Sequence, residues 1–180
     1  MVSEQIHALQ GRQCLEVTFD EATEQWIFDF EHKAMLTVAS PWRIIVGGRI
    51  RLGWRDHGQP FGLPSPVNGV SEATKFLGGV EVKSASVAAE TSDLVISFVS
   101  GCRLEVFNGS SGYEGWTLNA PGGERFVAQG GGDLVRFERG MSNFRVNPPG
   151  RPSAPGTSPP RAASRPAGYA KRSPHRAVGL

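Results

Sequence analysis

Histidine and cysteine are the residues of this chain best suited to metal binding or nucleophilic chemistry. No histidine forms an i, i+2 or i, i+4 pair with another or lies near a cysteine in sequence; the four are His7, His32, His57 and His175. Metal sites need closely spaced ligands on at least one element. Cys14 in a predicted strand and Cys102 at a predicted turn suit small buried side chains. No Gly-x-Ser-x-Gly motif is present. The sequence therefore indicates no metal, no cofactor and no catalytic residues.

Carboxylates gather in residues 16–31, a stretch without lysine or arginine. A surface so rich in one charge can steer and contact a basic partner. A carboxylate pair can also act as general acid and base, but nothing in this pattern would shift a pKa. An ordinary solvated sheet face would explain the same residues. We expect a protein partner to be bound by Glu16, Asp20, Glu21, Glu24 and Asp29, with Trp42 or Trp54 as the hydrophobic anchor.

A basic stretch with two tryptophans follows, and its arginines are Arg43, Arg49, Arg51 and Arg55. Arginine next to aromatic residues can stack on single-stranded nucleic acid or form the centre of a protein interface. An edge strand protected by arginines has the same pattern. Nucleic-acid binding through these four arginines, aided by a basic tail, is the alternative to protein binding.

The basic tail is residues 147–180, which hold six of the 19 cations and no acidic residue. The rest of the chain then carries 13 cations against 17 acids, so a mildly acidic body precedes a basic, proline-rich segment. Such a segment has too few large apolar residues to offset its ordering entropy, and we expect it to be disordered. We expect one domain over residues 1–146. With no long apolar run and a polar, acidic N-terminus, we also expect no membrane contact and a cytoplasmic location.

The body contains a repeat at a constant offset of 68 residues. Without a gap, nine residues of segment 2–38 recur in segment 70–106: Val2, Ser3, Glu4, Leu9, Gly11, Thr23, Phe30, Leu36 and Val38. The hydrophobic pattern matches as well. We predict two related halves, at about 2–45 and 70–138, whose apolar faces share one core.

Each copy is predicted to form a short helix followed by a three-stranded antiparallel meander. The helix would begin at Ser3 or Ser71 and end at a glycine. Alternation and turn residues place the strands at 14–19, 25–30 and 34–39 in the first copy and at 80–87, 94–99 and 102–107 in the second. An arginine-bearing edge strand is expected at 49–55, a loop at 59–68, and further strands at 113–118, 125–128 and 134–137. The fold class is thus α+β, mainly β.

Several short motifs resemble a small bacterial family of unknown function. Tyr113-Glu114-Gly115-Trp116-Thr117-Leu118 is similar to its Y-E-x-W-x-L motif, although Gly115 replaces the commoner alanine. A Pro121-Gly122-Gly123 turn follows, and Leu9-Gln10-Gly11-Arg12 resembles the family's L-x-G-R start. Ser40-Pro41-Trp42-Arg43 resembles its S-P-F motif. The resemblance spans about residues 6–138 and implies no catalytic residues.

The absence of a catalytic constellation, combined with the segregation of acidic and basic residues, indicates a function in binding other proteins. Proteins of this size and type resemble immunity and accessory proteins of bacterial toxin and defence loci. We therefore expect a non-enzymatic module whose partner is a protein, with a basic toxin domain as the favoured class. Tyr113 and Trp116 are expected to pack within the fold.

Overall fold

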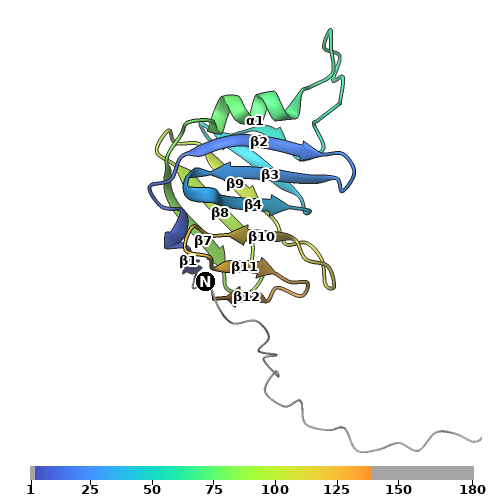
Figure 1. Ribbon diagram of the computed structural model, residues 1–180. Coiled ribbons are helices and arrows are strands. Elements are labelled where there is room, and N and C mark those ends of the chain that lie inside the picture. The colour runs from blue at the N-terminus through green and yellow to red at the C-terminus, as the bar shows by residue number, and fades with distance from the viewer. Residues whose placement is uncertain (1–2, 139–180) are drawn as a thin grey trace, which may run out of the picture. The chain divides into compact units, whose positions relative to one another are not determined.

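The computed structural model describes residues 3–138, which form two six-stranded antiparallel sheets and a single α-helix within that range. The first sheet has the order β1-β7-β8-β9-β5-β6 and the second β12-β11-β10-β4-β3-β2 (Figure 1). The mainly β class is therefore confirmed. The tail expected at 147–180 and the domain boundary at 146 lie outside the described residues.

Most strands and helices follow one another along the chain with short connections, and the longer ones are residues 54–68 and 107–115. The elements are β1 (Ser3–Gln5), a 3₁₀ turn (His7–Leu9), β2 (Cys14–Asp20), β3 (Gln25–Phe30), a second 3₁₀ turn (Glu31–Lys33), β4 (Ala34–Val38), β5 (Trp42–Val46), β6 (Arg49–Gly53), α1 (Gly69–Leu77), β7 (Val82–Ala88), β8 (Leu94–Phe98), β9 (Arg103–Val106), β10 (Trp116–Asn119), β11 (Arg125–Ala128) and β12 (Leu134–Phe137).

The two meanders match at the offset of 68 residues that the repeat indicates. In one, Cys14 pairs with Phe30 and Phe28 with Leu36; in the other, Val82 pairs with Phe98 and Ile96 with Leu104. Each meander also has a register irregularity at the same place in its first hairpin, after Cys14 and after Val82. These coincidences fit a duplicated unit, because chance similarity would not preserve the position of a bulge.

Reciprocal hydrogen bonds join the two copies. The Gly11 amide donates to the Val82 carbonyl at 2.9 Å, and the equivalent Gly79 amide donates to Cys14 at 2.7 Å. Between them, Gln13 and its own equivalent Glu81 form an isolated antiparallel bridge. The copies are thus related by an approximate two-fold axis that passes between these two residues.

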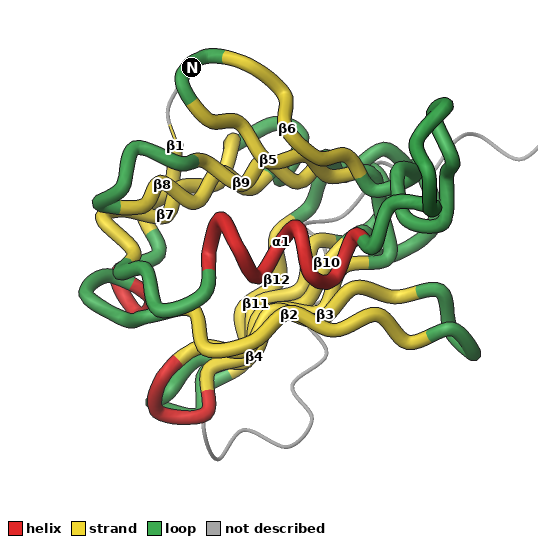
Figure 2. Tube along the Cα trace, turned by 90° about the horizontal axis from the view of Figure 1, so that it is seen from above, coloured by secondary structure: helices red, strands yellow, loops and turns green. Residues whose placement is uncertain are grey.

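Each meander receives its next strands from the other copy. After β4 the chain crosses to the first sheet, where β5 pairs with β9, and after β9 it crosses back, where β10 pairs with β4. The halves are therefore interlocked, which tandem meanders alone would not predict. The α1 helix contacts β2 and β6 and so covers one open side between the sheets (Figure 2).

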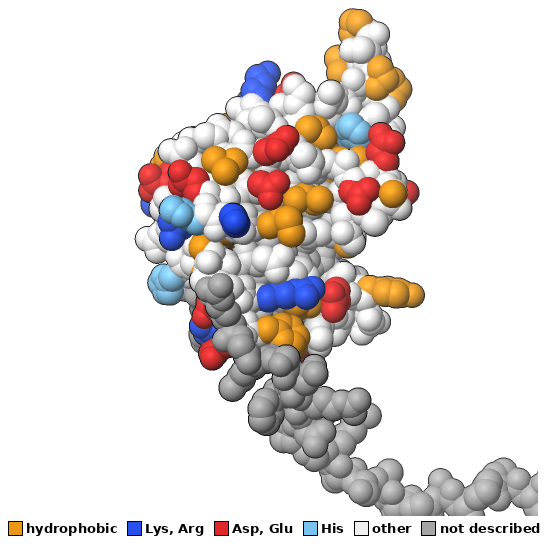
Figure 3. Space-filling model, in the orientation of Figure 1, with side chains coloured by type: hydrophobic (Ala, Val, Ile, Leu, Met, Phe, Trp, Pro, Cys, Tyr) orange, Lys and Arg blue, Asp and Glu red, His pale blue; other side chains and the backbone are white. Residues whose placement is uncertain are grey.

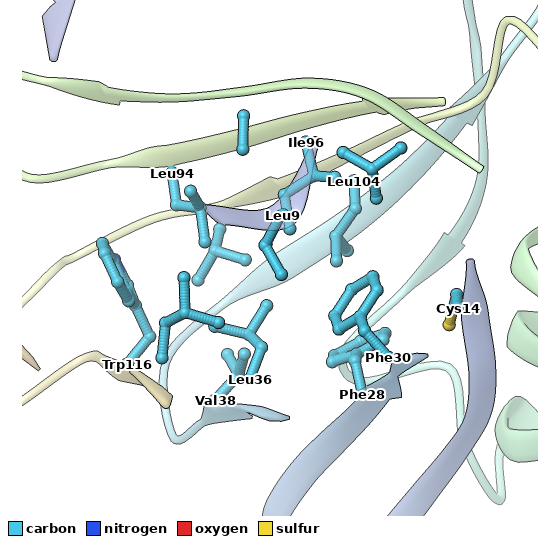
Figure 4. Packing of buried hydrophobic residues seen from close by; sticks show 14 of the residues in the cluster. Leu9, Cys14, Phe28, Phe30, Leu36, Val38, Leu94, Ile96, Leu104 and Trp116 are labelled. Carbon is cyan, nitrogen blue, oxygen red and sulfur yellow. The ribbon is translucent and has the colours of Figure 1, made fainter. Parts of the chain in front are cut away.

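The core fills the space between the sheets with side chains from alternate strand positions. Figure 4 shows Phe28, Phe30 and Leu36 of the second sheet facing Leu94, Ile96 and Leu104 of the first, and all six are buried. Cys14 and Cys102 are buried free thiols, as predicted. Burial raises the pKa of the Cys14 thiol to about 12, so this sulfur stays protonated.

The N-terminal helix predicted from Ser3 is wrong. Residues Ser3–Gln5 form β1, which pairs with β7, and only the turn His7–Leu9 is helical. A three-residue strand has no period of its own, so its partner in the fold decides its conformation. The second helix exists, but Asn68 rather than Ser71 caps it: the Asn68 side-chain oxygen accepts from the Ser71 amide at 3.0 Å.

Candidate functional site

Three of the predicted acidic residues lie at the turn between β2 and β3. The carboxylate of Asp20 accepts hydrogen bonds from the Ala22 amide at 2.9 Å and from the Thr23 hydroxyl at 2.7 Å. These bonds lower the pKa of Asp20 and give it a role in shaping the turn. Glu21 and Glu24 are exposed beside it. We call Asp20, Glu21 and Glu24 the acidic turn.

The other two acidic residues, Glu16 and Asp29, form a cross-strand pair along the same hairpin. Partial burial and the neighbouring charge of Glu16 raise the pKa of Asp29. The structure therefore distributes the five predicted carboxylates between the acidic turn and a strand pair farther along β2 and β3.

A proline-rich arm, residues 58–67, stands out from the molecule beside α1 (Figure 1). Its two sides are joined by hydrogen bonds from the Gly58 amide to the Val67 carbonyl and from the Val67 amide to the Gln59 carbonyl, both 2.9 Å. A tight turn at the tip leaves Phe61 64% and Leu63 55% exposed. The sequence predicts a loop here but indicates no role for it. We call it the apolar arm.

The apolar arm and the acidic turn lie at the same end of the fold. The ring of His57, at the base of the arm, lies 5.2 Å from Phe19 and 5.7 Å from Trp26, which flank the turn on β2 and β3. His57 Nδ1 also accepts from the Gly69 amide at 3.0 Å, which fixes the far side of the base to α1. Figure 3 shows acidic side chains below the projecting apolar arm.

Trp42 is not a surface anchor, which corrects the sequence-based expectation. Its ring is buried in the core, edge-on to Trp26 at 4.7 Å and to Phe28 at 5.6 Å. Trp54 is 37% exposed and carries the Arg55 guanidinium 4.6 Å over its ring, so it remains accessible.

The two aromatic residues predicted to pack within the fold also divide into one that is buried and one that is exposed. Trp116 is buried, as predicted, and its indole N–H donates to the Ser92 carbonyl at 2.8 Å. Tyr113 is 82% exposed, so the prediction that it packs in the fold is wrong. It precedes β10, which begins at Trp116 and not at Tyr113.

The four arginines of the alternative site do not share one free surface. The Nε atoms of Arg43 and Arg103 each lie 2.6 Å from a different oxygen of the Glu105 carboxylate, and Arg43 also lies over Phe107. Arg55 is stacked on Trp54, while Arg49 and Arg51 are exposed on β6. β6 is an edge strand, as predicted, but an irregularity in its pairing interrupts the alternation around Arg51.

Within residues 3–138, no group of three or more His, Cys, Asp or Glu side chains is arranged to hold a metal ion. The same part of the chain has no helix with the length and apolarity to span a bilayer.

Comparison with known proteins identifies one family. The model of the DUF6188 family, described as a family of unknown function, matches residues 8–138. No curated protein and no solved structure matches the chain. The expectation of an uncharacterised family over nearly this range is confirmed.

Proposed function

The chain belongs to the DUF6188 family of unknown function, and we propose that it is a protein-binding module that neutralises a basic partner, as an immunity protein does. The observation that carries this proposal is the position of the apolar arm beside the acidic turn, at one end of the fold.

The two surface features suit different stages of binding. Exposed carboxylates accelerate encounter with a basic surface and select against acidic proteins. Phe61 and Leu63 then supply apolar contact area at the tip of a segment whose own hydrogen bonds restrict it. A restricted tip loses less entropy on binding than a free loop would. The arm is thus suited to insert into an apolar pocket surrounded by basic residues.

The proposal is tested by capturing proteins from source-cell lysate on the immobilised chain at moderate salt. We expect one stoichiometric, basic protein on the unaltered chain and at least a tenfold loss of affinity for Phe61→Ser with Leu63→Ser. Glu21→Lys with Glu24→Lys should weaken binding and reverse its salt dependence. Phe137→Ser and Glu90→Lys, at exposed positions elsewhere, serve as controls. Equal losses for all variants would contradict the proposal.

Nucleic-acid binding is the second candidate, favoured by the partly exposed Trp54 with Arg55 stacked on it. Both follow β6, which bears the exposed Arg49 and Arg51. It predicts an affinity for single-stranded oligonucleotide that falls steeply with salt. Loss of that affinity in Arg49→Ala with Arg51→Ala would support it, whereas no gel shift at low salt would remove it.

A further inference from the structure

We propose that a surface hollow between the two crossover segments binds a small molecule in which an aromatic ring carries a short alkylammonium chain. This hollow has a volume of about 650 Å³ and lies between residues 39–41, which connect β4 to β5, and residues 109–115, which precede β10. Pockets for small molecules have volumes of roughly 300–1,000 Å³. This inference is independent of the proposed protein-binding function.

The two walls of the hollow are held in place by the interlocked fold. The Ala39 amide donates to the Gly115 carbonyl at 3.0 Å, and the Phe107 amide donates to the Pro41 carbonyl at 2.8 Å. The outer wall is fixed further by Ser110: its hydroxyl oxygen accepts from the Tyr113 amide at 2.9 Å, and its carbonyl accepts from the Gly131 amide. The hollow is therefore preformed, which favours its use as a binding site.

One buried oxygen atom in the lining of the hollow has no hydrogen-bond partner among the described residues. Ser40 lines it, is only 9% exposed, and its hydroxyl is unpaired. Buried polar atoms normally have partners. The Ser40 hydroxyl can donate or accept a hydrogen bond, and the negative charge of Glu114 in the same lining favours a ligand group that donates, such as an ammonium group.

The rim of the hollow favours a ligand that has a positive charge and a planar aromatic ring. Tyr113 presents an aromatic ring to solvent, and an exposed aromatic face attracts both stacked rings and cations. The lining includes the carboxylate of Glu114 but no lysine or arginine, so an anionic ligand would be repelled. Pro41 and Ala39 contribute apolar surface. Together these features match an aromatic ring that carries an ammonium group.

The probe for this site is tryptamine, with indole-3-acetate as its anionic counterpart. Both are titrated into the 15N-labelled chain, and amide shifts are followed by NMR. We expect saturable shifts confined to residues 39–41 and 107–115, with tryptamine binding at least tenfold more tightly than indole-3-acetate. Ser40→Ala should weaken tryptamine about fivefold, as expected for the loss of one hydrogen bond.

Two glycine variants distinguish ligand binding in the hollow from effects that any glycine substitution could have on the protein. Gly109 lines the hollow, and a Cβ atom there would meet no atom within 4 Å, so Gly109→Leu should fit without strain, occupy part of the hollow and abolish binding. Gly122 has equal free space on the β10–β11 turn, and Gly122→Leu should leave binding unchanged. No saturable shift at 10 mM tryptamine, equal binding of the two probes, or binding that survives Gly109→Leu would overturn the inference.

Discussion

Trp42 and Trp116 occupy equivalent positions in the two related copies, but the hydrogen bonding of their indole N–H groups differs. Both begin the strand that follows a crossover, both pair with a valine of a meander, and both are buried. Only Trp116 has a partner for its indole N–H, the carbonyl of Ser92; the N–H of Trp42 has none in the described structure. The two tryptophans therefore contribute differently to stability.

We predict that Trp116→Phe lowers the free energy of unfolding by about 1–2 kcal/mol more than Trp42→Phe. Both changes remove similar volume from the core, but only Trp116→Phe leaves the buried Ser92 carbonyl unpaired. Urea denaturation of the two variants, followed by circular dichroism, gives the difference. Equal losses would show that the indole hydrogen bond adds nothing to stability.

The cross-strand pair of Glu16 and Asp29 gives a second prediction, on pH. Because the pKa of Asp29 is raised in the folded chain, the contribution of Asp29 to stability falls as the pH rises from 3.8 through that folded value. Asp29→Asn should therefore increase the free energy of unfolding at pH 7, by about 0.5 kcal/mol as for other like-charged cross-strand pairs. At pH 3 this advantage should vanish. Stability measured across pH tests this, and an advantage that persists at pH 3 would contradict it.

Burial of single residues was predictable where alternation was strong. In β5 the spacing of Trp42 and Ile44 places both side chains on one face of the strand, which indicates that Trp42 is buried. The neighbouring arginines led instead to the prediction that Trp42 is a surface anchor. The hydrogen bonds that Asp20 accepts within the β2–β3 turn follow from local spacing, because their donors are only two and three residues away. The contact between His57 and Phe19 does not, since these residues are distant in sequence and meet only through the fold.

Among the elements, the two meanders were predictable because alternation, short turns and pairing are all local. The strand β1 and the crossing of β5 and β10 to the opposite sheets were not, because each depends on a partner far along the chain. The apolar arm belongs to this second group. Its prolines and glycines identify a loop, but only its hydrogen bonds and its base on α1 define its position.

The base of the apolar arm is packed so closely around Gly69 that adding a side chain there should destabilise the fold. A Cβ atom at Gly69 would lie 2.9 Å from the Trp26 ring and 3.0 Å from His57. We predict that Gly69→Ala displaces the base of the arm and lowers the free energy of unfolding by about 1–3 kcal/mol. Gly122→Ala, which meets no atom within 4 Å, is the matched control. Thermal unfolding of both variants provides the measurement, and unchanged stability in Gly69→Ala would mean that the base yields without strain.

At the scale of the whole molecule, the exchange of strands makes the two halves dependent on each other. In a fragment of residues 1–68, β5 would lack β9 and β4 would lack β10, leaving apolar faces and strand edges unpartnered. We predict that fragments 1–68 and 69–138 do not unfold cooperatively alone but regain β structure when mixed. Circular dichroism of each fragment, of the mixture and of residues 1–138 checks this. Cooperative unfolding of either fragment alone would contradict the interlocked arrangement.

The central claim is that the end bearing the apolar arm and the acidic turn binds a protein. Its most direct test is photocrosslinking in source cells with benzoylphenylalanine in place of Phe61, compared with the same replacement at the exposed Phe137. We expect one abundant adduct with a basic protein from position 61, diminished by Glu21→Lys with Glu24→Lys and absent from position 137. The same adducts from both positions, or none from position 61, would contradict it.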